Sequence, residues 1–340
     1  MKPVTLKQIA KQLNISITTV SKALKGYTDV SKKTKKKVQK LAKKLNYVPN
    51  SYAVNLRTKS SKTIGVIVPT TVHHFFSNVL KGIITVAEKK GYLVILLQSN
   101  EDFKLEKKQI NLLLNKGIDG ILISLSNKTN SYKHLEKVMD QEIPLVLFDK
   151  ITKSIHCSKV IINDRKASYD AVTYLIKKGY KRIAHFRGDL NPQNSIDRFL
   201  GYKQALLDNN ITFDQKLVYL CNNNKDFEDG YNNAKKLFEE DKHTVDAIFT
   251  ITDVVATGVL KYLNDHQIKI PEEVALFGFS NWFMSSVVSP SISTVNQPAE
   301  EMGKKAVKIL LNEIKNKKKK IAFDYATIVL PTELVIRESS

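Results

Sequence analysis

From Ile64 onward the chain alternates short apolar runs with segments of helical periodicity. Runs such as IGVIVP at 64–69 are apolar throughout, as expected for strands of a parallel sheet that is covered on both faces. The first runs are separated by helical segments near 76–90, 104–116 and 131–141. A second series of runs, from KVIIN at 159–163 to VALFGF at 274–279, repeats the alternation. The pattern predicts an α/β protein with two doubly wound lobes.

The C-terminal part of the sequence predicts how the two lobes are joined. An amphipathic helix near 299–315 is followed by strand-like segments at 322–337, which would cross back to complete both lobes. We therefore expect a core of residues 63–340. Its first lobe would comprise about 63–160 and 292–322, and its second lobe about 161–291 and 323–340.

Residues 5–24, ahead of this core, have the period of two short helices. Thr5 with Gln8 has the pattern of a capping box, and Ser16 is placed to cap the second helix. Packing of the apolar positions leaves an outer face on the second helix, made of Ile17, Thr18, Ser21 and Lys22. A helix-turn-helix has this arrangement, with its second helix in the DNA major groove, although an ordinary helical hairpin shares the pattern.

The distribution of charge favours the nucleic-acid interpretation. Residues 1–62 hold 15 lysines and one arginine against the single acid Asp29, a net charge of +15 out of +21 for the whole chain. A basic module joined to a nearly balanced body is typical of a protein that meets a polyanion. A membrane surface or a heparin-like polymer would attract the same charge. However, the sequence has neither an 18-residue apolar run nor a signal-peptide pattern, so we expect no membrane association and a cytoplasmic protein.

A third helix and a linker complete the predicted N-terminal domain of residues 1–47 and the hinge of 48–62. Ser31 would cap the third helix, whose lysine-rich surface suits contacts to DNA phosphates. Asn50 can cap a segment of about seven residues that is too short to persist as a helix alone. Its exposed Leu56, with Ala53 beside it, suits a wedge between base pairs in the minor groove, although a plain linker is the alternative.

Residues that follow the strands form the candidate binding site of the core, because ligands of open parallel sheets bind beyond the carboxyl ends of the strands. Here the chain places amides, hydroxyls and single carboxylates, together with the aromatic side chains Phe75 and Phe76. Such a mixture suits a neutral polyol such as a sugar. Phosphate-binding loops, nucleophile elbows and metal-ligand spacings are missing from the sequence, so we expect no enzyme, no cofactor and no metal site.

The order of these segments resembles the LacI/GalR family of bacterial transcription regulators. The residues that carry the resemblance are TLKQIAKQLNISITTVSKAL, KKVQKLAKKLNYVPN, NSYAVNLR, KTIGVIVP, RFLGYKQAL, TDVVATGVL, IPEEVALFGFSN and PSISTVNQP. The resemblance implies a homodimer that binds a pseudo-palindromic operator, with a periplasmic-binding-protein-like core. Ile17, Thr18 and Lys22 would read bases, Ser16 and Ser21 would support backbone contacts, and Leu56 would intercalate.

The resemblance also implies which residues bind the effector between the two lobes. Arg198 and Asp149 match the family's effector-binding positions, and Asp253 is a further candidate. The chain has Ser280 and Asn281 where many members have two carboxylates, and Phe227 is the nearest match to the family's stacking aromatic. With the strand-end positions, the predicted effector site is Phe75, Phe76, Asn100, Asp149, Arg198, Phe227, Asp253, Ser280 and Asn281.

These observations predict a sequence-specific DNA-binding repressor of carbohydrate-use genes that is controlled by a small molecule. A sugar receptor with a nonspecific DNA-binding head is a second hypothesis, and an enzyme is a third. A purine, a sugar phosphate or a phosphoprotein coregulator stays open as the controlling partner.

Overall fold

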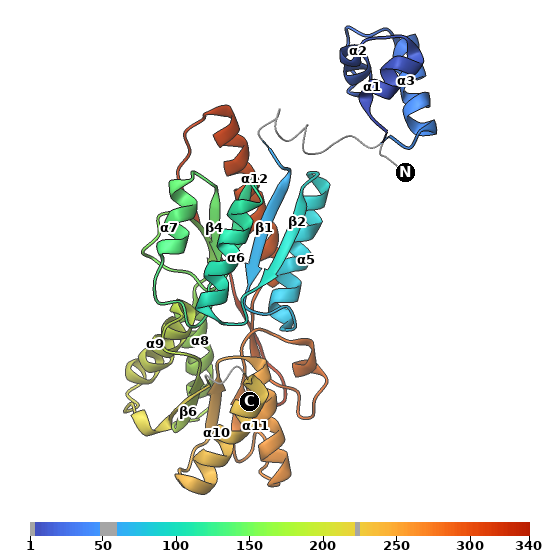
Figure 1. The fold of residues 1–340 in the computed structure, drawn as a ribbon. Coiled ribbons are helices and arrows are strands. Elements are labelled where there is room, and N and C mark those ends of the chain that lie inside the picture. The colour runs from blue at the N-terminus through green and yellow to red at the C-terminus, as the bar shows by residue number, and fades with distance from the viewer. Residues whose placement is uncertain (1–3, 48–59, 222–224) are drawn as a thin grey trace. The chain divides into compact units, whose positions relative to one another are not determined.

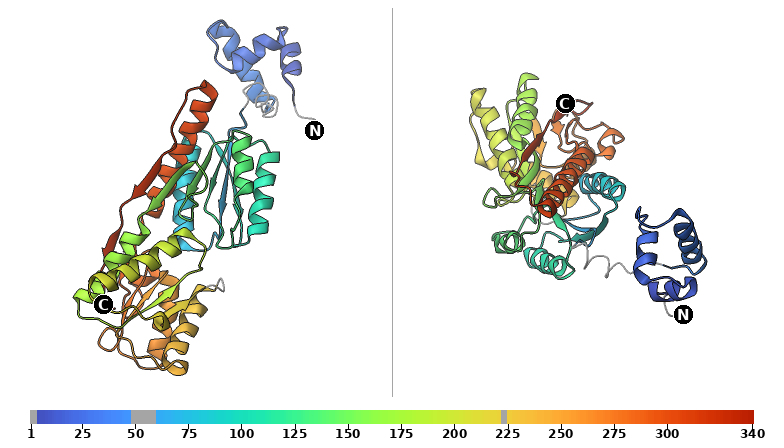
Figure 2. Two further views of the ribbon diagram at one scale, coloured as in Figure 1. Left: turned by 90° about the vertical axis from the view of Figure 1, so that its left-hand side faces the viewer. Right: turned by 90° about the horizontal axis from the view of Figure 1, so that it is seen from above.

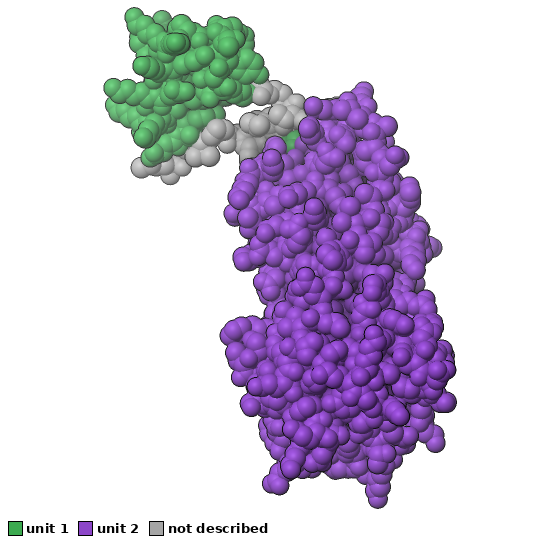
Figure 3. Space-filling view, turned by 180° about the vertical axis from the view of Figure 1, so that it is seen from behind, with its two compact units in different colours: residues 1–61 green, residues 62–340 purple. Residues whose placement is uncertain are grey.

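The computed structural model describes residues 4–47, 60–221 and 225–340. The chain divides into two compact units, residues 1–61 and 62–340 (Figure 3). The boundary lies one residue before the expected start of the core at residue 63. Within the described ranges, none of the helices has both the length and the apolar composition that crossing a membrane requires.

The first unit is a three-helix domain built from α1 (Leu6–Leu13), α2 (Ile17–Leu24) and α3 (Lys32–Lys44) (Figure 1). Each helix begins at a hydroxyl N-cap, as the sequence predicts: Thr5, Ser16 and Ser31. At Thr5 the capping box is complete, because the Thr5 backbone N–H donates to Gln8 Oε1 at 2.8 Å and the Gln8 N–H donates to Thr5 Oγ1. A small buried core of Ile9, Ala10, Val20, Ala23, Val30, Val38 and Ala42 holds the helices together.

The first lobe of the core contains a six-stranded parallel sheet of order β11-β5-β4-β3-β1-β2. Its strands are β1 (Thr63–Val68), β2 (Leu93–Gln98), β3 (Gly120–Ile123), β4 (Leu145–Phe148), β5 (Ser158–Ile162) and β11 (Thr327–Leu330). One face of the sheet packs on α5 (His74–Lys89) and α12 (Ala299–Lys319). The other face packs on α6 (Phe103–Asn115) and α7 (Lys133–Asp140) (Figure 2). The central strands β1, β3 and β4 are therefore buried on both sides, whereas the edge strands are partly exposed.

The second lobe repeats this architecture around a four-stranded parallel sheet of order β7-β6-β8-β9. Its strands are β6 (Ile183–Arg187), β7 (Val218–Leu220), β8 (Ala247–Thr250) and β9 (Ala275–Phe277). Helices α8 (Asp164–Lys177) and α9 (Gln193–Asp208) lie together on one face. On the other face lie α10 (Asp226–Lys235), which continues as a π-helical turn at Lys236–Glu240, and α11 (Asp253–Asp265).

The chain passes between the lobes after β5, before α12 and after β11. Next to these crossings, β10 (Thr294–Asn296) and β12 (Glu333–Val335) pair as a short antiparallel ribbon. One cluster of buried apolar side chains runs through both lobes, from Val66 of β1 to Phe277 of β9. The two lobes therefore share one buried apolar cluster, and each lobe has a further cluster of its own.

Two expected lobe boundaries are wrong in detail. Residues 323–340 were expected in the second lobe, yet β11 pairs in parallel with β5 in the first sheet, and only the chain beyond it crosses over. Likewise β5, which continues to Ile162, pairs with β4 in the first sheet and does not open the second lobe. Apolar strand runs identify strands but not the sheet they join, since that depends on pairing with distant residues.

Glu313 of α12 is a carboxyl group buried in the first lobe. Its side chain accepts a hydrogen bond from Ser158 of β5, and its residue is only 3% exposed. Burial raises the pKa of Glu313 from 4.5 to about 7. The folded protein therefore keeps this proton at pH values where the unfolded chain has lost it.

We expect the free energy of unfolding to fall as pH rises from about 4.5 to about 7, because the unfolded chain ionises first. Glu313→Gln removes the titration and keeps an acceptor for Ser158. Relative to the wild-type chain, the variant should gain on the order of 2 to 3 kcal/mol between pH 5 and pH 8. Denaturant unfolding at several pH values measures this, with Glu301→Gln on the exposed face of α12 as the control. Parallel pH profiles for the two variants would contradict the prediction.

Candidate functional site

A cleft of about 590 Å³ lies between the two lobes of the core. Its walls come from the carboxyl ends of the first-lobe strands, from the N-terminal end of α5 and from the loops and helix starts that follow β6, β7, β8 and β9. A cleft at this place and of this size is typical of a small-molecule site in an open α/β fold.

Six of the predicted effector-site residues line the cleft. They are Phe75, Phe76, Asn100, Asp149, Arg198 and Ser280. Asn100 and Asp149 each have a positive φ, at 52° and 56°, where the chain turns sharply out of a strand. Trp282, another residue that follows a strand, lines the same cleft and stacks on His74 with ring centroids 5.7 Å apart.

Three predicted effector-site residues do not line the cleft. Asp253 is fully buried and accepts hydrogen bonds from the Trp282 backbone and from the hydroxyl of Thr294, so its carboxylate is used inside the lobe. The amide of Asn281 is likewise engaged, accepting from Arg337 and donating to Asn296. Phe227 lies in the first turn of α10 and is 41% exposed outside the cleft.

Arg198 of α9 is held rigidly at the base of the cleft. Its Nε donates to Asp164 Oδ1 and its Nη1 donates to the carbonyl of Ile251, both at 2.8 Å. The guanidinium also lies 3.6 Å from the ring centroid of Phe279. Burial raises the pKa of Asp164 to about 7 despite the neighbouring Arg198 cation. Arg198 thus reaches the cleft with two of its N–H donors already bonded within the second unit.

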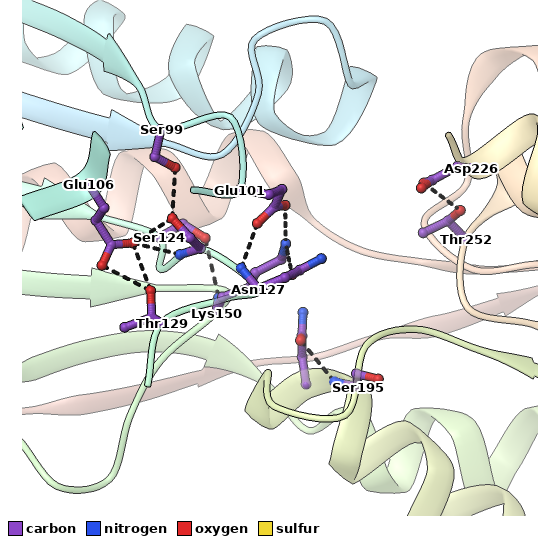
Figure 4. Close-up of polar contacts among 12 residues, drawn as sticks. Ser99, Glu101, Glu106, Ser124, Asn127, Thr129, Lys150, Ser195, Asp226 and Thr252 are labelled. Atoms are coloured by element: carbon purple, nitrogen blue, oxygen red, sulfur yellow. Dashed lines mark hydrogen bonds and ion pairs between the residues drawn. The ribbon is translucent and has the colours of Figure 1, made fainter. Parts of the chain in front are cut away.

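The other cation of the cleft is Lys150, which follows Asp149. Its ammonium donates to Glu101 and to the side-chain oxygen of Asn127. Glu101 in turn accepts the backbone N–H of Asn127 at 2.6 Å. Asp226 and Thr252 of the second lobe line the same cleft as this first-lobe group (Figure 4).

A buried network behind Asn127 fixes the loop that carries it. The Glu106 carboxylate of α6 is fully buried and accepts hydrogen bonds from the backbone and hydroxyl of Ser126, from Thr129 and from His134 at 2.7–3.1 Å. The hydroxyl oxygens of Ser126 and of Ser99, which follows β2, also lie within hydrogen-bond distance at 3.0 Å. Figure 4 shows Ser99, Glu106 and Thr129 of this network. With its acceptors satisfied, this network orders the cleft wall without requiring a ligand.

Several buried polar atoms at the cleft lack a protein hydrogen-bond partner among the described residues. They are Ser195 Oγ, Ser280 Oγ, Gln297 Nε2 and His74 Nδ1, and all four residues line the cleft. Buried polar groups without partners are costly, so a ligand rich in hydroxyl groups would complement them. In the part of the chain that the structure describes, no group of three or more His, Cys, Asp or Glu residues is arranged to hold a metal ion.

Both histidines at the cleft favour the neutral state. Burial lowers the pKa of His73 to about 3, and burial also lowers the pKa of His74, which contacts the carbonyl of Ser280 at 3.3 Å. This contact joins α5 of the first lobe to the loop after β9 of the second. Neither imidazole adds charge to the cleft at neutral pH.

In the first unit, the predicted base-reading positions lie on the surface of α2. Ile17 is 47% exposed, Thr18 is exposed, and Ser21 and Lys22 are half-buried. Lys22 donates to Asp29, which raises the pKa of Lys22 and lowers the pKa of Asp29. The predicted hinge residues Asn50, Ala53 and Leu56 lie outside the described residues.

The sequence predicted Asp149 and Arg198 but not the other four charged residues of the cleft, Glu101, Lys150, Asp189 and Asp226. Lys150 directly follows Asp149, and Glu101 directly follows Asn100. Extending the predicted strand-end segments by one residue would have included both. Asp189 follows β6 by two residues, and Asp226 begins α10. Gln297 and Ser195 had no such signal, because they reach the cleft from a lobe crossing and from a helix face.

Removing one partner of the Lys150–Glu101 pair should have unequal effects. Lys150→Met leaves the Glu101 carboxylate without its cation, and we expect a loss of about 1–3 kcal/mol in unfolding free energy. Glu101→Gln should cost less, because other carboxylates of the cleft remain near Lys150. The double variant should recover part of the Lys150→Met loss. Chemical denaturation of the three proteins tests this, and equal losses for both single variants would contradict it.

Comparison with known proteins identifies the family. Residues 61–330 match the model described as periplasmic binding proteins and sugar binding domain of LacI family, and residues 5–50 match bacterial regulatory proteins, lacI family. The transcriptional repressor PurR of Vibrio atlanticus (strain LGP32) is 32% identical over 315 residues, or 92% of each chain. Catabolite control protein A of Priestia megaterium is 31% identical over 338 residues, or 99% of each chain.

Among solved structures, the lac repressor dimer bound to operator and an anti-inducer matches with a TM-score of 0.87. It covers 99% of each chain at 22% identity, which supports the fold. The chain therefore belongs to the LacI family of bacterial regulatory proteins, whose members are DNA-binding transcriptional regulators and not enzymes.

Proposed function

We propose that this protein is a repressor of carbohydrate-use genes that binds a pseudo-palindromic operator and is controlled by a hydroxylated small molecule in the cleft. The observation that carries the proposal is a cleft with unpartnered buried polar atoms in the same chain as a basic helix-turn-helix unit. The names of the relatives support repression, since one is a transcriptional repressor and another a catabolite control protein. Such a protein would act in the cytoplasm, where the operator is.

Operator binding would place the exposed face of α2 in a major groove. Ile17, Thr18 and Lys22 would face base edges, and Ser16, Ser21 and Thr5 would lie near the phosphates. Ser31 would place the start of α3 beside the backbone, where the lysines of α3 add affinity that depends on salt. Asn50, Ala53 and Leu56 would act in the central minor groove.

A second copy of the chain would complete the operator-binding form. On the first lobe, the edge strand β2 exposes Leu93 at 65% and Leu96 at 39%, and Ile84 of the neighbouring α5 is also exposed. An apolar, unpaired edge strand is normally covered by a partner. Two heads held side by side would match the two half-sites of a pseudo-palindrome.

The first test is sequence specificity. A DNA site obtained by selection from random sequence should be bound far more tightly than random duplex at moderate salt, typically by at least a thousandfold. Equal binding to both would favour the alternative of a nonspecific DNA-binding receptor. Footprinting with purified full-length protein separates the two hypotheses.

Lys22→Gln should relax specificity, because a lost base contact typically costs about 1–3 kcal/mol on the correct sequence only. Lys36→Gln on the exposed surface of α3 is the matched control. It should weaken binding to selected and random DNA alike, and lower the salt slope by about 0.9 if it contacts one phosphate. Equal losses on both DNAs for Lys22→Gln would remove its base-reading role.

Leu56→Ser should weaken binding to the selected operator and leave effector affinity unchanged, because a polar side chain does not replace an apolar wedge. Electrophoretic mobility shifts measure the first quantity and calorimetry the second. Val54→Ser is a control in the same segment. A parallel loss of DNA and effector affinity would show a general defect of the core and exclude the wedge role.

A further inference from the structure

The charges that line the cleft do not balance. The described lining residues include four carboxylates, Glu101, Asp149, Asp189 and Asp226, against two cations, Lys150 and Arg198. The neighbouring residues 222–224, which lie outside the described ranges, are asparagines and carry no charge. The cleft therefore has two more carboxyl groups than cationic side chains, since both histidines favour the neutral form.

Each of the two cations already has a carboxylate partner. Arg198 is bonded to Asp164, a carboxyl group that does not line the cleft. Lys150 is bonded to Glu101 at 2.5 Å, and its charge also acts on Asp149, Asp189 and Asp226. The charge of one ammonium group thus favours the ionised form of carboxylates in both lobes.

Asp226 is a second-lobe carboxylate that has no ion pair among the described residues. Its hydrogen bond within these residues comes from a neutral hydroxyl, Thr252 Oγ1, at 3.3 Å. Burial raises the pKa of Asp226, and Lys150 opposes this only from its bonded position beside Glu101. Asp189, by comparison, lies near the exposed Lys128 as well as Lys150.

A ligand that fills the cleft excludes water from these carboxylates. Desolvation disfavours charge that has no counter-charge, and a phosphorylated ligand would add further negative charge to the same space. A neutral sugar would satisfy the unpartnered hydroxyl and amide atoms of Ser195, Ser280 and Gln297 but would leave the excess negative charge. A protonated amine on a polyhydroxylated ligand satisfies both requirements.

We infer that the cleft binds an amine-bearing polyol, of the amino-sugar class, with its ammonium group at Asp226 and its hydroxyl groups toward Ser195, Ser280 and Gln297. Asp226 is thereby a specificity-determining residue that selects amino sugars over sugar phosphates. This inference rests on the proposed function of the cleft as the effector site. Figure 4 shows Asp226 facing the Lys150–Glu101 group, so an ammonium bound there would lie between the two lobes.

The experiment compares matched sets of ligands on the full-length protein at pH 7. For glucose, galactose and mannose, the parent sugar, its 2-amino-2-deoxy and 6-amino-6-deoxy forms and its 6-phosphate are titrated by calorimetry. We expect at least one amino sugar to bind about tenfold or more tightly than its parent, the gain of a charge-assisted hydrogen bond, and the phosphates not to bind. A parent sugar or a phosphate that binds as tightly as any amino sugar overturns the inference, as does the failure of every amino sugar to bind.

Asp226→Asn should weaken binding of the amino sugar, so that its advantage over the parent sugar falls to within about threefold. Glu228→Gln is the matched control, because Glu228 lies in the same first turn of α10, is exposed and does not line the cleft. An amine preference that survives Asp226→Asn removes the assignment. Specific operator binding is measured on the same preparations. If the protein binds its operator specifically but shows no preference for the amine, only this inference fails. If specific operator binding is itself missing, the proposed function is contradicted.

Discussion

The buried guanidinium of Arg198 fixes how the second lobe meets the cleft. One side chain joins three separate elements: α9, which carries it, the start of α8 at Asp164, and the end of β8 at Ile251. A buried cation must be paired, and two of the Arg198 N–H groups donate to one carboxylate and one backbone carbonyl. The same bonds hold the first lobe crossing, after β5, next to the ligand space. The cleft walls are therefore set before any ligand is bound.

The second cation of the cleft, Lys150, acts on carboxylates of both lobes. Arg198 is paired with Asp164, and the charge of Lys150 acts from the first lobe on Asp189 and Asp226 of the second. The loop that holds Asn127 against Lys150 is itself fixed by the buried Glu106 network. The fixed Lys150–Glu101–Asn127 group of the first lobe therefore lines the cleft opposite Asp189 and Asp226 of the second lobe. The side-chain hydrogen bonds to these two carboxylates come from neutral groups, Asn127 and Thr252.

Sequence patterns predicted the elements well and their assembly less well. The caps at Thr5, Ser16 and Ser31 and the periods of the helices are local properties, so residues three or four positions apart suffice to reveal them. The placement of β11 beside β5 depends on residues more than 160 positions apart, and no local period encodes it. For the same reason Asp253 was expected in the cleft: it follows a strand, but the hydroxyl of Thr294 and the backbone of Trp282 claim its carboxylate.

Coupling between cleft and DNA requires that a ligand bind one arrangement of the lobes better than another, since equal affinity for two states shifts neither. A ligand that touched only one lobe would not meet this condition. Here the unpartnered atoms belong to both sides: His74 Nδ1 comes from α5 of the first lobe, while Ser195 and Ser280 belong to the second. A ligand can form hydrogen bonds to atoms of both lobes at once only when the distance between the lobes matches its size. Two or three of them supply the roughly 1–3 kcal/mol typical of allosteric coupling, at the cleft where the lobe crossings meet.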